Sequence, residues 1–251
     1  MRTTSFLNEY LEERNYTNPG DATDTAFHYA RGTKESFFEW IARHPADQEA
    51  FNSVMTMNRN LIDTEWYEHF PVEEKLQVSP DRALLVDIGG GIGHDLSRLK
   101  QHLPQLPGKL VVQDLPGVIG DIKEPLPEGV EAMVYNMFDP QPVKGAKAYY
   151  LRTVLHDWPD KQAVEILKRV REAMAEDSIL LINEHNMAGS NPPKLSTAID
   201  QDMMEIFSSL ERTEDEWITL LEKGGFAIVK VWKPAVMGFV ERALYEAVPK
   251  A

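Results

Sequence analysis

The alternation of apolar runs and helical patterns after residue 78 constrains the fold of this chain more than any other feature. Short, continuous apolar segments are separated by stretches with helical periodicity, such as residues 94–103 and 159–174. Strands and helices that alternate in this way predict an α/β fold with a doubly wound sheet, covered by helices on both faces. The predicted strands span residues 84–88, 109–114, 130–136, 146–155, 178–183, 226–232 and 238–248.

The first part of the chain has a different pattern, because its aromatic and aliphatic side chains recur at helical spacing without a strand pattern. We therefore predict a helical, aromatic-rich segment over residues 1–78 and a ligand-binding domain over residues 79–251. Near the other end, Thr213 and Glu216 form a capping-box signature. This signature predicts one more helix, which the sequence "KGGF" ends.

Composition excludes several functional classes. The 251 residues carry 26 Lys and Arg against 40 Asp and Glu, a formal net charge of −14, so general affinity for nucleic acid or an anionic membrane is not expected. There is no cysteine, which excludes disulfide frameworks and thiolate zinc sites. No apolar run approaches the roughly 20 residues that span a bilayer, and the polar start has no signal-peptide core. We therefore expect a soluble, cytoplasmic protein.

Four glycines follow the first predicted strand, at the strand end where doubly wound folds bind ligands: Gly89, Gly90, Gly91 and Gly93. Glycines let the chain turn tightly and approach a ligand closely, and the helix that follows offers free N–H donors. The dinucleotide fingerprint is not met, because Leu96 stands where its third glycine belongs. A sharp strand-to-helix turn without a ligand is the alternative interpretation.

Asp114 ends the second predicted strand, 21 residues after Gly93. An acidic residue at about this distance meets the two ribose hydroxyls of a bound nucleoside. The plainer interpretation is an exposed turn aspartate. Together, the glycine loop and Asp114 indicate an adenosine-containing ligand that lacks a diphosphate.

The stretch "YYLRTVLHDWPD" (149–160) places a histidine and two acids where a buried strand ends. With the segments "LLVDIGGGIGHDL" (84–96), "VVQDLPGVI" (111–119), "LLINEH" (180–185) and "LERTEDEWITLLEKGGF" (210–226), in this order, it resembles the S-adenosylmethionine-dependent O-methyltransferases of the caffeate type, particularly the fungal branch acting on aromatic metabolites. The resemblance covers roughly residues 18–248. It implies a seven-stranded methyltransferase sheet with the last strand antiparallel, S-adenosylmethionine as cofactor and a reaction that needs no metal.

The resemblance also implies three catalytic residues. His156 matches the general base of the family, and Glu184 and Glu211 match the two carboxylates that flank and orient it. A phenol with a pKa of about 10 is a poor nucleophile until its proton is removed, and a histidine with a pKa near 6.5 is a suitable base. Taken singly, each residue has a plainer interpretation: a buried core histidine, an acid at a strand end and an acid at a helix start.

Further matches concern the cofactor. Arg152 occupies the basic position near the carboxylate of the methyl donor, and Asn136 with Met137 matches the pair that contacts adenine. The family often has an aspartate at the position of Asn136. The cofactor-binding residues implied by the resemblance are Gly89, Gly90, Gly91, Asp114, Leu115, Asn136, Met137 and Arg152.

Two further expectations concern the surroundings of His156. Asp157 is expected to point away from it and to cap the following helix, with Asp160 as a competitor for that position, because consecutive residues of a strand or helix point apart. The aromatic acceptor is expected to lie against apolar side chains of the helical segments, although such side chains commonly form the core. The candidates are Trp40, Phe51, Met55, Met57, Met203, Met204 and Phe207.

The expected function is methyl transfer to a hydroxyl of an aromatic small molecule. The alternatives are a family member that uses S-adenosylmethionine for a non-methylating reaction, such as a dehydration or pericyclic rearrangement, and a binding protein without catalysis. Full-length relatives carry an additional amino-terminal winged-helix region that forms an intertwined homodimer. Because this chain begins after most of that region, as an excised or a shortened form, dimerisation is left open.

Overall fold

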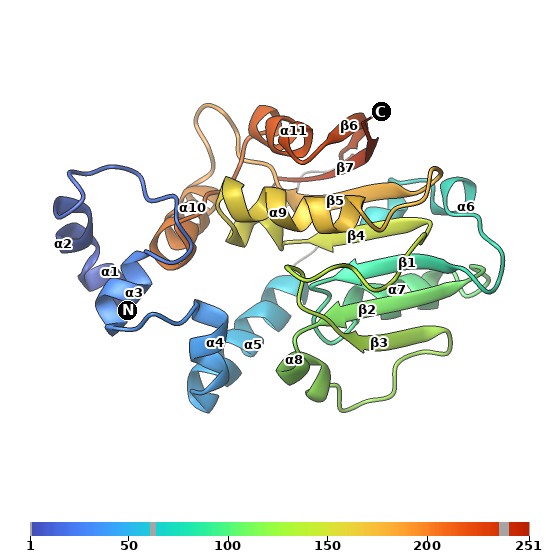
Figure 1. The fold of residues 1–251 in the computed structure, drawn as a ribbon, viewed down its shortest axis with the longest axis horizontal. Helices are drawn as coiled ribbons and strands as arrows, with labels where there is room; N and C mark the ends of the chain where they lie inside the picture. Colours follow the sequence, from blue (N-terminus) through green and yellow to red (C-terminus); the bar gives the residue numbers. More distant parts are fainter. Residues whose placement is uncertain (1, 61–63, 236–240, 251) are drawn as a thin grey trace.

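The protein, described here from a computed structural model covering residues 2–60, 64–235 and 241–250, is built on one seven-stranded sheet (Figure 1). The strand order is β3-β2-β1-β4-β5-β7-β6. Strands β1 to β5 run parallel, and β7 is antiparallel to both of its neighbours, so the predicted sheet with an antiparallel last strand is confirmed. The strands are β1 (Ala83–Ile88), β2 (Lys109–Asp114), β3 (Val130–Val134), β4 (Ala148–Arg152), β5 (Ile179–His185), β6 (Phe226–Trp232) and β7 (Arg242–Pro249).

The register of the parallel strands gathers their carboxyl ends at one edge of the sheet. Asp87 of β1 lies opposite Val112 of β2 on one side and Tyr150 of β4 on the other. The strand order reverses at β1, and ligands of open α/β sheets bind outside such a reversal. The ends of β1, β2, β4 and β5 are therefore the positions at which functional side chains are expected to meet.

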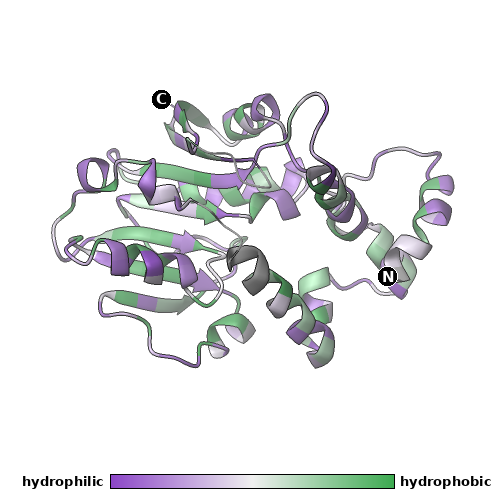
Figure 2. Ribbon diagram, turned by 180° about the vertical axis from the view of Figure 1, so that it is seen from behind, coloured by the Kyte–Doolittle hydropathy of each residue, from purple (hydrophilic) through white to green (hydrophobic). Residues whose placement is uncertain are grey.

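Each face of the sheet buries a separate apolar core. On one face, α9 (Asp160–Arg171) and α11 (Glu214–Lys223) contribute Leu167 and Trp217, both fully buried. On the other face, α7 (His94–His102) packs together with the short elements η1 (Trp66–Glu68) and α6 (Val72–Lys75). Figure 2 shows the strands in hydrophobic colours and the surrounding helices with hydrophilic outer faces. The continuous apolar strands are explained by this cover on both sides.

The described elements before residue 78 are all helical, as predicted, while the boundary between residues 1–78 and 79–251 stays a prediction. The first five of these elements lie beyond the carboxyl ends of the parallel strands, near α10 (Lys194–Phe207), whereas η1 and α6 pack on a face of the sheet (Figure 1). Hydrogen bonds between described residues join the first five to the part of the chain around α10, among them those from Thr4 Oγ1 to Glu205 Oε2 over 2.9 Å and from Ser208 Oγ to the carbonyl of Asp24 over 2.8 Å. These helices are α1 (Arg2–Ser5), α2 (Leu7–Glu12), α3 (Ala26–Arg31), α4 (Phe37–Ala42) and α5 (Pro45–Asn60), with η1 and α6 following.

The capping box predicted for the last helix is present. The Thr213 side chain accepts from the N–H of Glu216, and the Glu216 carboxylate accepts from the N–H of Thr213 over 2.8 Å. The helix ends at Lys223, before the two predicted glycines. In the described part of the chain, no helix combines the length and apolar character that crossing a membrane requires.

Candidate active site

The loop after β1 has a conformation that its glycines make accessible. Gly89, Gly91 and Gly93 have φ values of 72°, 62° and 84°, in the left-handed region that side chains disfavour. Gly90 is constrained by space, since a Cβ atom there would lie 2.5 Å from Oδ2 of Asp87. The backbone is thus folded closely over the sheet edge. A Cβ at Gly91 would meet no atom within 4 Å, so the loop is open on its other side.

Asp114 is hydrogen-bonded directly to this loop. Its Oδ2 accepts from the N–H of Gly91 over 2.8 Å, and its Oδ1 accepts from the N–H of Leu115 over 2.7 Å. Burial raises the pKa of Asp114, while these two N–H donors act in the opposite direction. A carboxylate has about four lone-pair positions, so each oxygen can still accept another donor. The carboxylate therefore suits a ligand that presents two hydroxyls.

The residues after β3 approach the same loop. Met137 Cε lies 3.6 Å from the position of a Cβ at Gly89. Asn136 is exposed, and its Oδ1 accepts from the N–H of Phe138 over 3.1 Å. Leu115 is also exposed, at the start of α8 (Pro116–Gly120). The structure thus brings Met137 to the glycine loop, whereas Asn136 and Leu115 offer their side chains to the surface.

Arg152, at the end of β4, is paired with an acid that sequence analysis missed. Its Nη1 donates to Asp95 Oδ1 over 3.0 Å, and the hydroxyl of Tyr150 donates to Asp95 Oδ2 over the same distance. Asp95 lies in the first turn of α7, directly after the glycine loop. Its position in "GHDL" was the available signal. Arg152 is thus held beside the amino end of α7.

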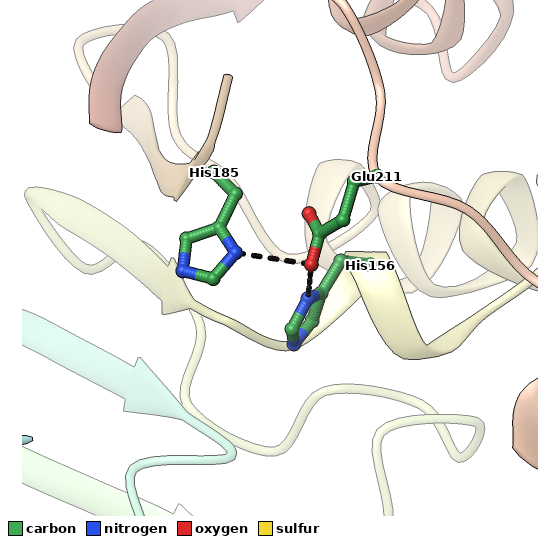
Figure 3. A group of neighbouring side chains, drawn as sticks. All are labelled: His156, His185 and Glu211. Atoms are coloured by element: carbon green, nitrogen blue, oxygen red, sulfur yellow. Dashed lines mark hydrogen bonds and ion pairs between the residues drawn. The ribbon is translucent and has the colours of Figure 1, made fainter. Parts of the chain in front are cut away.

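The centre of the site is a carboxylate oxygen shared by two histidines (Figure 3). Glu211 Oε1 lies 2.8 Å from His156 Nδ1 and 3.0 Å from His185 Nδ1. His156 lies in the short 3₁₀ helix η2 (Leu155–Asp157) after β4, and His185 is the last residue of β5. All three side chains are buried. His185 was not among the predicted site residues, although it directly follows Glu184 at a strand end.

Glu184 has a different place from the one expected. In the part of the chain that the structure describes, it hydrogen-bonds the backbone of the turn that carries His156, and not the imidazole ring. Its Oε1 accepts from the N–H groups of Val154 and Leu155 over 2.9 Å and 2.8 Å. The carboxylate thereby satisfies two buried donors that a turn leaves without partners.

The same turn is held from its carbonyl side by Arg212, which sequence analysis also missed. This side chain is only 1% exposed. Its Nη1 donates to the carbonyl of Leu155 over 3.0 Å, and its Nη2 donates to the carbonyl of Trp158 over 2.9 Å. Arg212 directly follows Glu211, so the segment "LERT" both orients the imidazole and fixes its backbone. We call Glu184 and Arg212 the turn clamp.

The expectation for Asp157 is wrong. Its Oδ1 lies 3.5 Å from His156 Nε2, close enough for an ion pair. The N-cap position of α9 is Pro159, with no side-chain capping bond, while Asp160 pairs with Arg212 and Lys223. The physical reason is the 3₁₀ turn over residues 155–157, whose geometry does not separate neighbouring side chains as an extended strand does.

The electrostatics of the three central groups depend on one another. Burial lowers the pKa of His156, but the carboxylates of Glu211 and Asp157 outweigh it and raise this pKa to about 10. Burial lowers the pKa of His185 to about 4 against the opposing effect of Glu211. For Glu211, burial alone would raise the pKa, but the two histidines hold it far below its usual range. At neutral pH, Glu211 is therefore ionised, His156 protonated and His185 neutral.

The three residues also have the composition of a metal site, since their ligand atoms lie within 4.8 Å of one another. The distances from Glu211 Oε1 to the two Nδ1 atoms, 2.8 Å and 3.0 Å, are those of hydrogen bonds. Ligands around a tetrahedral zinc ion with bonds of about 2.0 Å are about 3.3 Å apart. We therefore interpret the two contacts as hydrogen bonds and not as the edges of a metal site.

An aromatic cluster joins the helical segment to the turn with His156. The ring of Phe38 stacks on Phe207 at 5.5 Å between centroids and lies 6.4 Å from Trp158, which contacts Phe138 at 4.8 Å. Of the expected acceptor residues, Phe51 and Phe207 belong to this cluster through Phe37 and Phe38, at the distances of paired aromatic rings.

The other acceptor candidates lie elsewhere or are only half-buried. Trp40 stacks on His44 and reaches the cluster through Phe27, which contacts both Trp40 and Phe37. Met55 is exposed, and the side chain of Met57 lies outside the described residues. Met203 and Met204 are half-buried on α10.

The sheet, the glycine loop with its strand-end acid and the buried histidine are the features of an α/β protein of the methyltransferase type. Residues 10–227 match the family model described as an O-methyltransferase domain, and the chain belongs to this family. It is 39% identical over 249 residues to the demethylsterigmatocystin 6-O-methyltransferase of Aspergillus parasiticus, covering 98% of this chain and 62% of that protein. The chain thus spans about three fifths of the length of that relative. The demethylsterigmatocystin 6-O-methyltransferase stcP of Emericella nidulans is 42% identical over 212 residues. That alignment covers 84% of this chain and 100% of the other protein.

Solved structures show the same fold. The structure titled as a complex of LepI with SAM has a TM-score of 0.89 at 34% identity, covering 98% of this chain and 63% of that one. A structure titled "A Pericyclic Reaction enzyme" has a TM-score of 0.86, also at 34% identity, with 98% and 64% covered. OxaC in complex with sinefungin and meleagrin has a TM-score of 0.89 at 29% identity, with 100% and 64% covered.

Proposed function

We propose that the protein transfers a methyl group from S-adenosylmethionine to a hydroxyl of an aromatic small molecule, with His156 as general base. The observation that carries this proposal is the 2.8 Å contact between His156 Nδ1 and the buried Glu211 carboxylate. An ionised carboxylate only accepts hydrogen bonds, so Nδ1 carries a proton and Nε2 is the nitrogen that can take one up. The family to which the chain belongs supports the same reaction.

The residues at the ends of β1, β2 and β4 fit the proposed cofactor. Gly89, Gly90 and Gly91 bring backbone close to it, Asp114 offers its carboxylate to two hydroxyls, and Arg152 provides a cation for a carboxylate. S-adenosylmethionine, when bound, supplies an electrophilic methyl group. The complexes of relatives with SAM and with sinefungin support this choice.

The chemistry of the chain itself is a proton transfer. His156 Nε2 takes the proton of the acceptor hydroxyl, which leaves an oxygen anion as the nucleophile. The positive charge that arises on the ring is stabilised by Glu211 through Nδ1. The turn clamp keeps the backbone of His156 in place during this step. The imidazole must be neutral to act, so turnover requires the loss of the proton that His156 holds at neutral pH.

An aromatic acceptor is supported by the cluster around Phe38, Phe207 and Trp158 and by the names of the relatives, which include demethylsterigmatocystin 6-O-methyltransferases. Planar rings pack favourably against such side chains. We propose a small-molecule acceptor on these grounds. A homodimer and a cytoplasmic location stay predictions.

The test is methyl transfer from S-adenosylmethionine to a panel of hydroxylated aromatics, followed by mass spectrometry. His156→Ala is expected to retain donor binding in calorimetry and to lower turnover by ~10²–10⁴-fold, because only the proton transfer is lost. Turnover equal to that of the parent would remove His156 from the role of base.

A second candidate is favoured by the relative titled as a pericyclic reaction enzyme. In that case the protein would bind S-adenosylmethionine and rearrange or dehydrate a substrate without consuming the methyl group. The same assay separates the two candidates. A product of unchanged or dehydrated mass, with the donor unconsumed, would favour the rearrangement over methyl transfer.

A further inference from the structure

His185 is placed to act on the proposed base through a carboxylate that both histidines contact. Its Nδ1 lies 3.0 Å from the same oxygen of Glu211 that holds His156 Nδ1 at 2.8 Å (Figure 3). The two rings are 5.6 Å apart and nearly perpendicular. Because the carboxylate is an acceptor only, both Nδ1 atoms are donors, and the two imidazoles compete for one oxygen.

We propose that His185 is a positioning residue that sets the proton affinity of His156 by sharing Glu211 Oε1. This inference rests on the proposed function and deepens it. A second donor withdraws part of the negative charge that Oε1 offers to the first, so His156 holds its proton less tightly than it would beside an unshared carboxylate. The second carboxylate oxygen, Oε2, is buried and has no hydrogen-bond partner among the described residues, which leaves the competition concentrated on Oε1.

The position of His185 is fixed by its backbone. It is the last residue of β5, paired in register with Arg242 of β7, and its carbonyl accepts from Trp217 Nε1 over 2.8 Å. These backbone contacts hold the ring at hydrogen-bond distance from Glu211. His185 is therefore part of the frame to which Glu211 and His156 are attached.

Charged groups on every neighbouring element act on this pair. Glu211, Asp157 and Glu184 favour the protonated form of His156. Around His185, Glu211 favours protonation, while Arg242 and the charge of His156 oppose it. Since burial also disfavours a charge on His185, it stays a neutral donor while His156 gains and loses its proton. Because His185 keeps its protonation state while His156 gains and loses a proton, its hydrogen bond to Glu211 can set the proton affinity of His156 throughout the reaction.

The experiment compares His185→Phe, which removes the donor and keeps the ring, with His185→Asn, which keeps an N–H donor. Histidine NMR titration reads the pKa of His156 directly, and the pH profile of methyl transfer reads its consequence. His185→Phe is expected to raise the pKa of His156 by about one pH unit. Its turnover at pH 7 should then fall about tenfold and recover at alkaline pH, with unchanged acceptor KM.

Two outcomes separate this role from a structural one. His185→Asn should keep the profile of the parent, and Tyr245→Phe is the matched control. It removes a buried hydroxyl bonded to Asn186, the residue after His185, without touching Glu211. A loss of activity in His185→Phe that is equal at every pH, or a shift of the same size in Tyr245→Phe, would overturn the proposal. Because NMR needs no turnover, failure of the proposed function would leave this test intact.

Discussion

At the residue scale, the charge state of His156 determines when the site can work. Burial lowers its pKa, and the nearby carboxylates of Glu211 and Asp157 raise it to about 10. Without these carboxylates, burial would leave a neutral ring that attracts protons weakly. With these carboxylates, the imidazole becomes a strong base that is protonated at neutral pH and must lose this proton before it can accept one from the substrate. The raised pKa thus increases the driving force for proton transfer to His156. It also lowers the fraction of molecules in which His156 is neutral, and so able to act as a base, at neutral pH.

A pH dependence with a definite sign follows. A base with a raised pKa is neutral only above that pKa, so kcat should rise with pH and reach its midpoint above the ordinary histidine value of about 6.5. The measurement is kcat for methyl transfer between about pH 6 and pH 11, a range that extends past the raised pKa of His156. A midpoint at or below about 6.5 would contradict the environment described for His156.

A second residue-scale prediction concerns Glu184. Gln in its place keeps an oxygen that can accept from the N–H groups of Val154 and Leu155, whereas Ala leaves both donors buried without a partner. Each buried donor without a partner costs about 1–3 kcal/mol. The loss of unfolding free energy should therefore be several times larger for Glu184→Ala than for Glu184→Gln. Urea unfolding and turnover are measured together. If both variants lose activity equally with unchanged stability, Glu184 acts through its charge on the imidazole and not through the backbone.

The residues of the site are easier to predict from the sequence than the contacts between them. The pairing of His156 with Glu211 was expected from the motifs, and the structure brings them together. His185 was missed because a residue at a strand end has no local signature of its own, and only the approach of the loop before α11 gives it a partner. Asp157 was misplaced because a 3₁₀ turn, which the apolar run did not reveal, replaces the end of the predicted strand.

At the element scale, the loop between β1 and α7 depends on glycine at four of its five positions, residues 89–93. Its constraint is partly conformational, at Gly89, Gly91 and Gly93, and partly steric, at Gly90. The sequence predicted the turn from the number of glycines. It did not predict which of them are limited by contact, because that depends on Asp87 and on Val112 of the neighbouring strand.

The steric part of this constraint can be tested with a matched pair of variants. In Gly90→Ala the new Cβ would lie 2.5 Å from Asp87 Oδ2 and 2.8 Å from Val112 Cγ2, so the loop must move. We expect at least tenfold weaker binding of S-adenosylmethionine in calorimetry, about 1.4 kcal/mol. Gly117→Ala, where a Cβ meets nothing within 4 Å, is the control and should bind like the parent. Equal affinities in both variants would show that the loop does not approach the donor.

At the scale of the whole molecule, helices α1 to α5 lie beyond the end of the sheet that carries the site. Their contacts run through α10 and the aromatic cluster, so residues far apart in sequence form one wall beside His156. The order of strands and helices was predictable from apolar periodicity, because each element buries its own pattern. The placement of the amino-terminal helices was not, since helical periodicity indicates a buried face without naming its partner.

The role of the aromatic cluster of Phe38, Phe207 and Trp158 can be tested through acceptor binding. Phe38→Ala removes the ring that stacks on Phe207 and contacts Trp158. We expect the KM for an aromatic acceptor to rise about tenfold or more, since a lost aromatic contact of this kind is worth about 1 kcal/mol beyond its buried area, with donor affinity unchanged. Phe6→Ala, at an exposed ring that contacts Tyr29, is the control. A KM that stays at the value of the parent would place the acceptor elsewhere.

The strand order β5-β7-β6 has a consequence for the synthesis of the protein. Among the described strands, β6 pairs only with β7, which comes last in the chain and inserts between two strands made before it. While residues 242–249 are still inside the ribosome, β6 has no partner and β5 presents an open edge next to His185. The sheet, and with it the frame of the catalytic pair, can therefore close only after translation has passed β7.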